Sequence, residues 1–302
     1  MTAHAVVVLG PTASGKSDVA MAAASAAGNT HIVACDSMQV YRRMDIGTAK
    51  PTTADRSAVP HHGLDLCEPS ERYTVSRFVD DVNEARGTIR AAGARELVVG
   101  GTGLYLTAIT DGLSMPGEWP EIRAELEADP DTASLYARLS ALDPLAVTRM
   151  EPNNRRRIIR ALEVCLGSGE PFSSFGEGVS TFPESGITFI GLRWQRDALR
   201  ERIAQRVHKM VQAGLVDEVR GLLAEPGGLS PTAAQALGYK EMIEHVNGQV
   251  ALDSAIADVV LRTQQFAVRQ ERWFRRDPRI RWVDVSADPV AEVTPLVVRA
   301  LS

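Results

Sequence analysis

Short apolar runs alternate with longer stretches of helical pattern along much of this chain. The runs are rich in valine and isoleucine, and runs of this kind between helices are typical of a parallel sheet with helices on both faces. The sequence therefore predicts an α/β fold built on a parallel sheet. The expected strands occupy residues 4–9, 31–35, 96–99, 187–192 and 281–285.

The middle of the chain departs from this alternation. Between residues 113 and 187 there is no strand pattern, and helices are expected over 120–138, 140–150 and 155–166. We interpret this segment as an all-helical subdomain inserted into the sheet domain. The sheet domain is then formed by residues 1–112 and by a second, mostly helical part, 188–302.

A glycine-rich stretch lies between the first expected strand and an alanine-rich helix. Its pattern, G-x-x-x-x-G-K-S in a strand–turn–helix context, is that of a phosphate-binding loop and not of a turn without a ligand. Backbone amides and the helix dipole attract an anion, Lys16 adds a positive charge, and the Ser17 hydroxyl is a ligand for Mg²⁺. The loop consists of Gly10, Pro11, Thr12, Ala13, Ser14, Gly15, Lys16 and Ser17.

The ends of the first three expected strands carry polar or glycine-rich segments, namely the phosphate loop, residues 36–41 and residues 100–105. Ligands of parallel sheets bind at the carboxyl ends of the strands, so all three are expected to meet at one site. Asp36 has three interpretations there: it holds Mg²⁺ through water, it takes a proton from a nucleophile, or it caps a turn. The polar loop 44–51 is a candidate for closing over the site. The neighbouring His61 and His62 are expected to pack in a loop and not to bind a metal.

Composition narrows the class of protein. The 302 residues are 44% hydrophobic and 24% charged, as in an ordinary globular protein, and no apolar run approaches the ~18 residues of a membrane span. The N-terminus has no signal-peptide pattern, and three scattered cysteines suggest neither disulfides nor a zinc site, so a cytoplasmic protein is expected.

Arginine is unevenly distributed in this chain of net charge −5. Residues 153–160 hold four arginines and no acid, and residues 262–282 hold seven arginines, two acids and several aromatic residues. Such strips suit an RNA-binding surface, and they equally suit solvated helix faces. Composition leaves both interpretations open.

Several strings taken together resemble those of the tRNA dimethylallyltransferase (tRNA isopentenyltransferase) family. The resemblance runs in order from about residue 5 to residue 275, and the combination of DSMQVYR with MDIGTAKP is not found in kinases. It implies transfer of a dimethylallyl group from its diphosphate to N6 of the adenosine 3′ to the anticodon (tRNA position 37), with Mg²⁺ required and pyrophosphate released. The strings are GPTASGKS, DSMQVY, MDIGTAKP, VGGTGLYL, NNRRRIIRALEV, ERIAQRVHKM and ALGYKEM.

The resemblance also implies roles for individual residues. The phosphate loop and Arg206 would hold the diphosphate, with Ser17 toward Mg²⁺. Asp36 would accept a hydrogen bond from the adenine amine and act as general base, and Thr102 would contact the substrate beside it. The expected tRNA contacts are Asp36, Ser37, Met38, Gln39, Thr102, Arg123, Arg156, Arg157 and Arg160. A C-terminal zinc finger, present in some eukaryotic members, is not expected here.

Two other classes fit parts of the sequence. An ATP-dependent small-molecule kinase would use the same loop, because a phosphate-binding loop contacts the phosphate groups and not the rest of the ligand. A kinase function, however, leaves the arginine strips unexplained. A non-catalytic RNA-binding or nucleotide-switch protein would not need Asp36 beside the loop. The transferase is therefore the favoured function, acting on tRNA as a monomer and away from membranes.

Overall fold

The computed structural model describes residues 5–176, 178–179 and 181–302. The chain forms two compact units: a core unit, Met1–Asp111 with Phe182–Ser302, and an insertion unit, Gly112–Thr181. The insertion unit ends earlier than residue 187 because the next residues pack on the core. Arg279 lies over the Phe182 ring, 5.6 Å from its centroid, and donates a 2.8 Å hydrogen bond to the carbonyl of Pro183.

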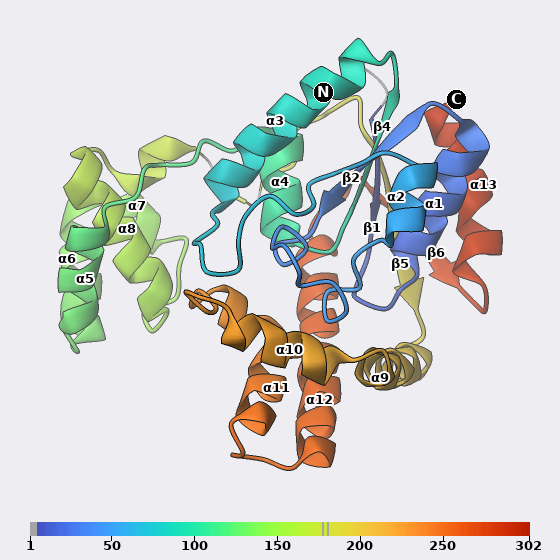
Figure 1. The fold of residues 1–302 in the computed structure, drawn as a ribbon. Coiled ribbons are helices and arrows are strands. Elements are labelled where there is room, and N and C mark those ends of the chain that lie inside the picture. Colours follow the sequence, from blue (N-terminus) through green and yellow to red (C-terminus); the bar gives the residue numbers. More distant parts are fainter. Residues whose placement is uncertain (1–4, 177, 180) are drawn as a thin grey trace. The chain divides into compact units, whose positions relative to one another are not determined.

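The core unit contains a six-stranded sheet of order β3-β2-β4-β1-β5-β6 (Figure 1). Every pairing in it is parallel, which confirms the predicted fold class. The chain moves to one side of β1 after that strand and crosses to the other side after β4, so the topology switches at β1. The strands are β1 (Val6–Leu9), β2 (Thr30–Cys35), β3 (His61–His62), β4 (Arg95–Gly100), β5 (Thr188–Trp194) and β6 (Ile280–Val285).

Alternate strand residues bury their side chains on opposite faces of the sheet. Val6 and Val8 of β1 pack with α1 (Lys16–Ala27), α13 (Pro289–Leu301) and the first half of α9 (Arg196–Gln212). In α1 the buried positions are mostly alanines, which allow the helix to lie close to the sheet and to α13 (Figure 1).

The opposite face of the sheet is covered by other helices. Val7 and Leu9 of β1 pack in a cluster with α3 (Val75–Ala91), α4 (Gly103–Asp111) and α12 (Leu252–Phe274). Two further helices, α10 (Leu215–Ala224) and α11 (Tyr239–Val246), pack on each other, and α11 packs on α12. The short α2 (Thr53–Ala58) and a 3₁₀ turn, Ala233–Gln235, complete the core unit.

The described residues of the insertion unit form helices joined by loops, with their own core around Leu139 and Leu162. The expectation of one helix over 120–138 is wrong, because the chain breaks at Asp129-Pro130. Proline lacks an amide hydrogen and disfavours helical geometry in the residue before it. Asp131 then caps the next helix by accepting the amides of Ala133 and Ser134. The elements are α5 (Pro120–Ala128), α6 (Thr132–Leu142), α7 (Pro144–Val147), α8 (Arg155–Ser168) and a 3₁₀ turn, Phe172–Phe175.

Two further expectations need correction. The segment 140–150 is not one helix, because Asp143 ends α6 and caps α7. His61 and His62 form β3 at the edge of the sheet and are not a loop; His62 Nε2 lies 3.0 Å from Nδ1 of His31 in β2. No group of three or more metal-ligating side chains occurs among the described residues.

Crossing a membrane takes a helix of about 20 predominantly apolar residues. No helix within residues 5–176, 178–179 and 181–302 combines the length and the apolar character that crossing a membrane requires.

A buried ion pair joins α3 to the sheet and leads to the first prediction. Arg86 Nε lies 3.0 Å from Glu96 Oε1 in β4, and Arg86 Nη2 also donates to the carbonyl of Ile109. Glu96→Ala leaves the buried guanidinium without its counter-charge and is expected to lower the free energy of unfolding by about 3–5 kcal/mol. Urea denaturation measures this, with the exposed Glu84→Ala on α3 as the control. A loss below about 1 kcal/mol, typical of a surface pair, would contradict the prediction.

Candidate active site

The phosphate loop follows β1, the strand at which the topology switches. Gly10 and Gly15 have φ angles of 154° and 88°, which favour glycine. A Cβ atom at Gly15 would lie 2.5 Å from Cγ of Pro289, so this turn also has no room for a side chain. Because α1 begins at Lys16, the amides of its first turn have no partners in the helix and are available to an anion.

Side chains from elements distant in the sequence bind the backbone of this loop. Trp194 Nε1, at the end of β5, donates to the carbonyl of Ser14 at 3.0 Å, and Arg202 Nε of α9 donates to that of Ala13 at 2.9 Å. The Arg202 guanidinium also lies over the Trp194 ring, 4.3 Å from its centroid. Two carbonyls of the loop therefore accept hydrogen bonds from side chains of the core unit, which fixes the shape of the loop.

Positive charge is concentrated at the loop. Burial and the neighbouring Arg206 guanidinium lower the pKa of the Lys16 ammonium to about 8, while the carboxylates of Asp36 and Asp18 oppose this shift. Burial also lowers the pKa of Arg206, again against the effect of Asp36 and Asp18. Both cations thus lie where their charged forms are disfavoured, and an anion bound between them would relieve that cost.

Asp36 follows the end of β2, and among the described residues one of its two carboxylate oxygens accepts hydrogen bonds. Its Oδ1 accepts the amides of Met38 at 2.8 Å and Gln39 at 3.4 Å, as in a turn cap. Thr102, which follows β4, accepts the amide of Ser37 through its Oγ1 at 3.2 Å. The second oxygen of Asp36 and the hydroxyl hydrogen of Thr102 have no partner in the described part of the chain.

Loop 44–51 is held firmly by α10 and α11. The Glu218 carboxylate accepts the backbone amides of Asp45, Ile46 and Gly47 at 2.7–3.2 Å and the hydroxyl of Tyr239 at 2.6 Å. The buried Lys50 ammonium binds the carboxylates of Asp45 and Asp65. Loop 44–51 is therefore held in place by these bonds, and it forms one side of the site.

A cavity of about 400 Å³ joins these segments within the core unit. Its basic wall comes from the phosphate loop and α9, its acidic groups are Asp18 and Asp36, and part of its lining is apolar. The lining includes Thr12, Ala13, Gly15, Lys16, Ser17, Asp18, Asp36, Gln39, Thr48, Arg202, Arg206, Lys209 and Gln270, with the apolar Ala20, Met21, Ile32, Ala34, Val99 and Phe266.

Some predicted residues lie behind this lining and shape it. Gly10, Pro11 and Ser14 form the buried part of the phosphate loop, while Ser37, Met38 and Thr102 support Asp36. Arg202 and Lys209 were missed as site residues, although their spacing from Arg206 puts them on one helix face. Glu218 and Gln270 were missed too, and no local signal marks them.

The arginines expected to contact tRNA differ in their surroundings within the insertion unit. Arg123 and Arg160 lie 3.5 Å and 3.1 Å from the carboxylate of Glu163, whose side chain is only 1% exposed. Arg156 and Arg157 are exposed, and their side chains have no hydrogen bond or ion pair among the described residues. The two exposed arginines are therefore free to meet a phosphate, whereas the other two neutralise a buried acid.

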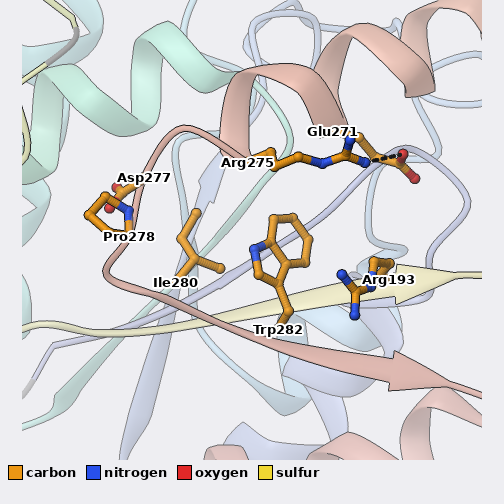
Figure 2. Close-up of a pocket in the computed structure, with 7 residues that line it drawn as sticks. All are labelled: Arg193, Glu271, Arg275, Asp277, Pro278, Ile280 and Trp282. Carbon is orange, nitrogen blue, oxygen red and sulfur yellow. Dashed lines mark ion pairs between the residues drawn. The ribbon is translucent and has the colours of Figure 1, made fainter.

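The C-terminal arginine strip borders a second cavity of about 330 Å³, shown in Figure 2. Arg275 lies on one side of this cavity, with its Nη2 3.9 Å from Oε2 of Glu271. Arg193 lies on the other side, and its Nη2 donates to Oδ2 of Asp284 at 2.7 Å. Trp282 lies between them (Figure 2). Because its arginines face carboxylates, this cavity lacks the excess positive charge of the first one.

Comparison with known proteins gives the family. The profile of the IPP transferase family matches residues 39–277. The chain belongs to the IPP transferase family. Enzymes of this family are prenyltransferases, so the chain is a transferase and the phosphate loop with Asp36 is its candidate active site.

Relatives of this IPP transferase cover nearly its whole length. The tRNA dimethylallyltransferase of Geobacter metallireducens is 43% identical over 92% of each chain, and that of Streptomyces coelicolor is 42% identical over 98% of this chain and 94% of its own. The solved tRNA isopentenylpyrophosphate transferase of Bacillus halodurans is 36% identical with a TM-score of 0.71, covering 99% and 97% of the two chains. A eukaryotic dimethylallyltransferase acting on tRNA is 25% identical with a TM-score of 0.81, covering 97% of this chain and 77% of its own.

The lowered pKa of Lys16 predicts how this transferase binds anions as the pH changes. An anion prefers the ammonium form, which is lost as the pH rises through about 8. The affinity for inorganic pyrophosphate is therefore expected to fall above pH 8 by up to about tenfold per pH unit. Calorimetric titration from pH 6.5 to 9.5 measures it, and Lys16→Met reports the ionisation of pyrophosphate itself. Parallel pH profiles for the two proteins would contradict the prediction.

Proposed function

We propose that the protein transfers the dimethylallyl group of dimethylallyl diphosphate to N6 of the adenosine 3′ to the anticodon, at tRNA position 37, and releases pyrophosphate. One observation carries the proposal. A single cavity of the core unit is lined both by a cationic phosphate loop and by a carboxylate, Asp36, that has an unused oxygen. The first suits a leaving diphosphate, and the second suits an amine that must lose a proton.

The charges around the loop favour departure of the diphosphate. As the bond between C1 of the allyl group and oxygen breaks, negative charge builds on the pyrophosphate. Lys16, Arg206 and the amides of the first turn of α1 stabilise that charge, which is usually the largest contribution to catalysis of this kind. Mg²⁺, which prefers oxygen ligands and substrate phosphates, would be held by the Ser17 hydroxyl with Asp18 and Asp36 nearby, and would neutralise part of the same charge.

Asp36 is proposed as the general base. The adenine N6 amine forms the new C–N bond, and its surplus proton passes to the free carboxylate oxygen of Asp36. Thr102 and the backbone amides around Ser37 hold that carboxylate in place. A base in an RNA loop must leave its stack to reach such a cavity, and single-stranded loops are where proteins read RNA best.

ATP is the alternative ligand of the phosphate loop, and it would make the protein a kinase. The carboxylate and the tRNA-directed relatives favour the transferase. We expect a monomer that works in the cytoplasm, where its tRNA substrate is found.

Two parallel incubations with Mg²⁺ and unmodified tRNA test the transferase directly, one with dimethylallyl diphosphate and one with ATP. Mass spectrometry of the digested tRNA is expected to show prenylated adenosine in the first, and no ADP is expected in the second.

Asp36→Asn keeps the oxygen that accepts the Met38 amide but removes the base. It is expected to lower the transfer rate about 100- to 10,000-fold while pyrophosphate binding stays within about threefold.

The exposed Asp258→Asn on α12 is the matched control for that substitution and is expected to keep the wild-type rate. ADP without prenylated adenosine would reject the transferase in favour of the kinase. Loss of pyrophosphate binding in Asp36→Asn would instead give Asp36 a metal-binding or structural role.

The arginines of α8 lead to a separate prediction about tRNA affinity. Removing both exposed side chains, in Arg156→Ala with Arg157→Ala, is expected to weaken tRNA binding and to reduce the slope of log K against log salt by about 1–2. Filter binding between 50 and 300 mM salt measures the slope, with the exposed Arg138→Ala on α6 as the control. An unchanged slope would show that these two arginines do not contact RNA phosphates.

Arg160→Ala is instead expected to destabilise the insertion unit, because it removes one of the positive charges that neutralise the buried Glu163 carboxylate.

A further inference from the structure

A buried glutamine of α12 binds two of the active-site loops at once. Gln270 is 7% exposed, and its Oε1 accepts the amide of Thr12 in the phosphate loop at 2.8 Å. Its Nε2 donates at 2.8 Å to the carbonyl of Gly101, just after β4. One side chain thus links the segments that follow two adjacent strands.

The two bonds specify the side-chain amide. The amide of Thr12 requires an acceptor and the carbonyl of Gly101 requires a donor, and the glutamine side-chain amide supplies both. The partner position is equally specified, since a Cβ atom at Gly101 would lie 2.4 Å from Gln270 Nε2. Glycine at 101 and glutamine at 270 therefore fit each other.

This linkage continues to Asp36. Gly101 is followed by Thr102, whose Oγ1 accepts the amide of Ser37, next to Asp36. Hydrogen bonds therefore connect the phosphate loop through Gln270 to Gly101, and the adjacent Thr102 is hydrogen-bonded to the segment that carries the Asp36 carboxylate. Its middle lies in a helix of 23 residues, whose neighbouring Ala267 and Phe274 are buried.

We propose that Gln270 is a positioning residue that sets the distance between the phosphate loop and the Asp36 segment, and hence between C1 of the donor and the adenine amine. The inference rests on the transfer reaction proposed above. Each loop binds its own ligand without Gln270, so the two affinities depend little on it. Bond formation depends on both loops, and a displacement of about 1 Å costs on the order of 100-fold in rate.

Single-turnover transfer with the full-length enzyme, tRNA, dimethylallyl diphosphate and Mg²⁺ separates binding from alignment. Gln270→Leu is expected to lower the single-turnover rate about 10- to 100-fold. The dissociation constants of pyrophosphate and of tRNA, measured separately, are expected to change less than about threefold. Gln265→Leu, an exposed glutamine on the same helix, is the control and should match the wild type.

Gln270→Glu supplies a readout that a merely structural role would not move. The carboxylate still accepts the Thr12 amide but cannot donate to Gly101, whereas the protonated acid does both and has nearly the same shape as glutamine. Its rate relative to the wild type at the same pH is therefore expected to rise as the pH falls from 8 toward 5. The same ratio for Gln270→Leu is expected to stay constant.

The outcomes separate this inference from the proposed function. Prenylation by the wild type together with a full rate in Gln270→Leu overturns the inference alone. It is also overturned if both affinities fall as far as the rate, or if the Gln270→Glu ratio does not depend on pH. Absence of prenylation by the wild type overturns the proposed function, and the inference with it. Gln270→Glu keeps the test decisive if Gln270→Leu does not fold, which circular dichroism monitors.

Discussion

Confined positive charge is the constraint on which the rest of this site depends. The phosphate loop brings backbone amides and Lys16 to one wall of a cavity and α9 brings Arg206, and burial makes both cations less favourable in their charged forms. Carboxylates offset this only in part, since one oxygen of Asp36 caps its own turn. The free protein therefore maintains a positively charged site, and an anionic ligand neutralises that charge when it binds. Electrostatic stabilisation arranged before the substrate arrives needs no reorganisation during the reaction.

The segments that follow the strands supply most of the groups that act directly, and the helices after β5 supply Arg206 and the side chains that hold these segments. Carboxyl ends of parallel strands meet at one edge, so loops far apart in sequence become neighbours there. Arg202 of α9 and Glu218 of α10 each bind the backbone of one loop, and Gln270 of α12 binds the backbone of two. Buried polar groups of this kind rigidify a site when they are fully hydrogen-bonded, because each unmade bond would be costly.

Local patterns predicted the fold class and the strand–turn–helix geometry around residues 10–17 well. Valine-rich runs are short enough to indicate strands, and glycines at this spacing between a strand and a helix are typical of a phosphate loop. Helix ends were less predictable: the predicted helix 120–138 ran past Pro130, although proline restricts the residue before it. Roles that depend on distant partners could not be predicted, since nothing near Glu218 in the sequence indicates that it binds the amides of residues 45–47.

The arginines show the same limit from another side. Residues 155–160 form one basic string, yet in the structure Arg155 binds backbone carbonyls of the insertion unit and Arg160 faces Glu163. Only Arg156 and Arg157 remain exposed without partners among the described residues. A run of arginines in the sequence shows that charge is present, but not whether the N–H donors of each guanidinium already have partners. Binding to a phosphate requires a guanidinium with donors that are not already used. The structural role of Arg160 follows from Glu163, a buried acid on the same helix that needs a counter-charge whether or not RNA is bound.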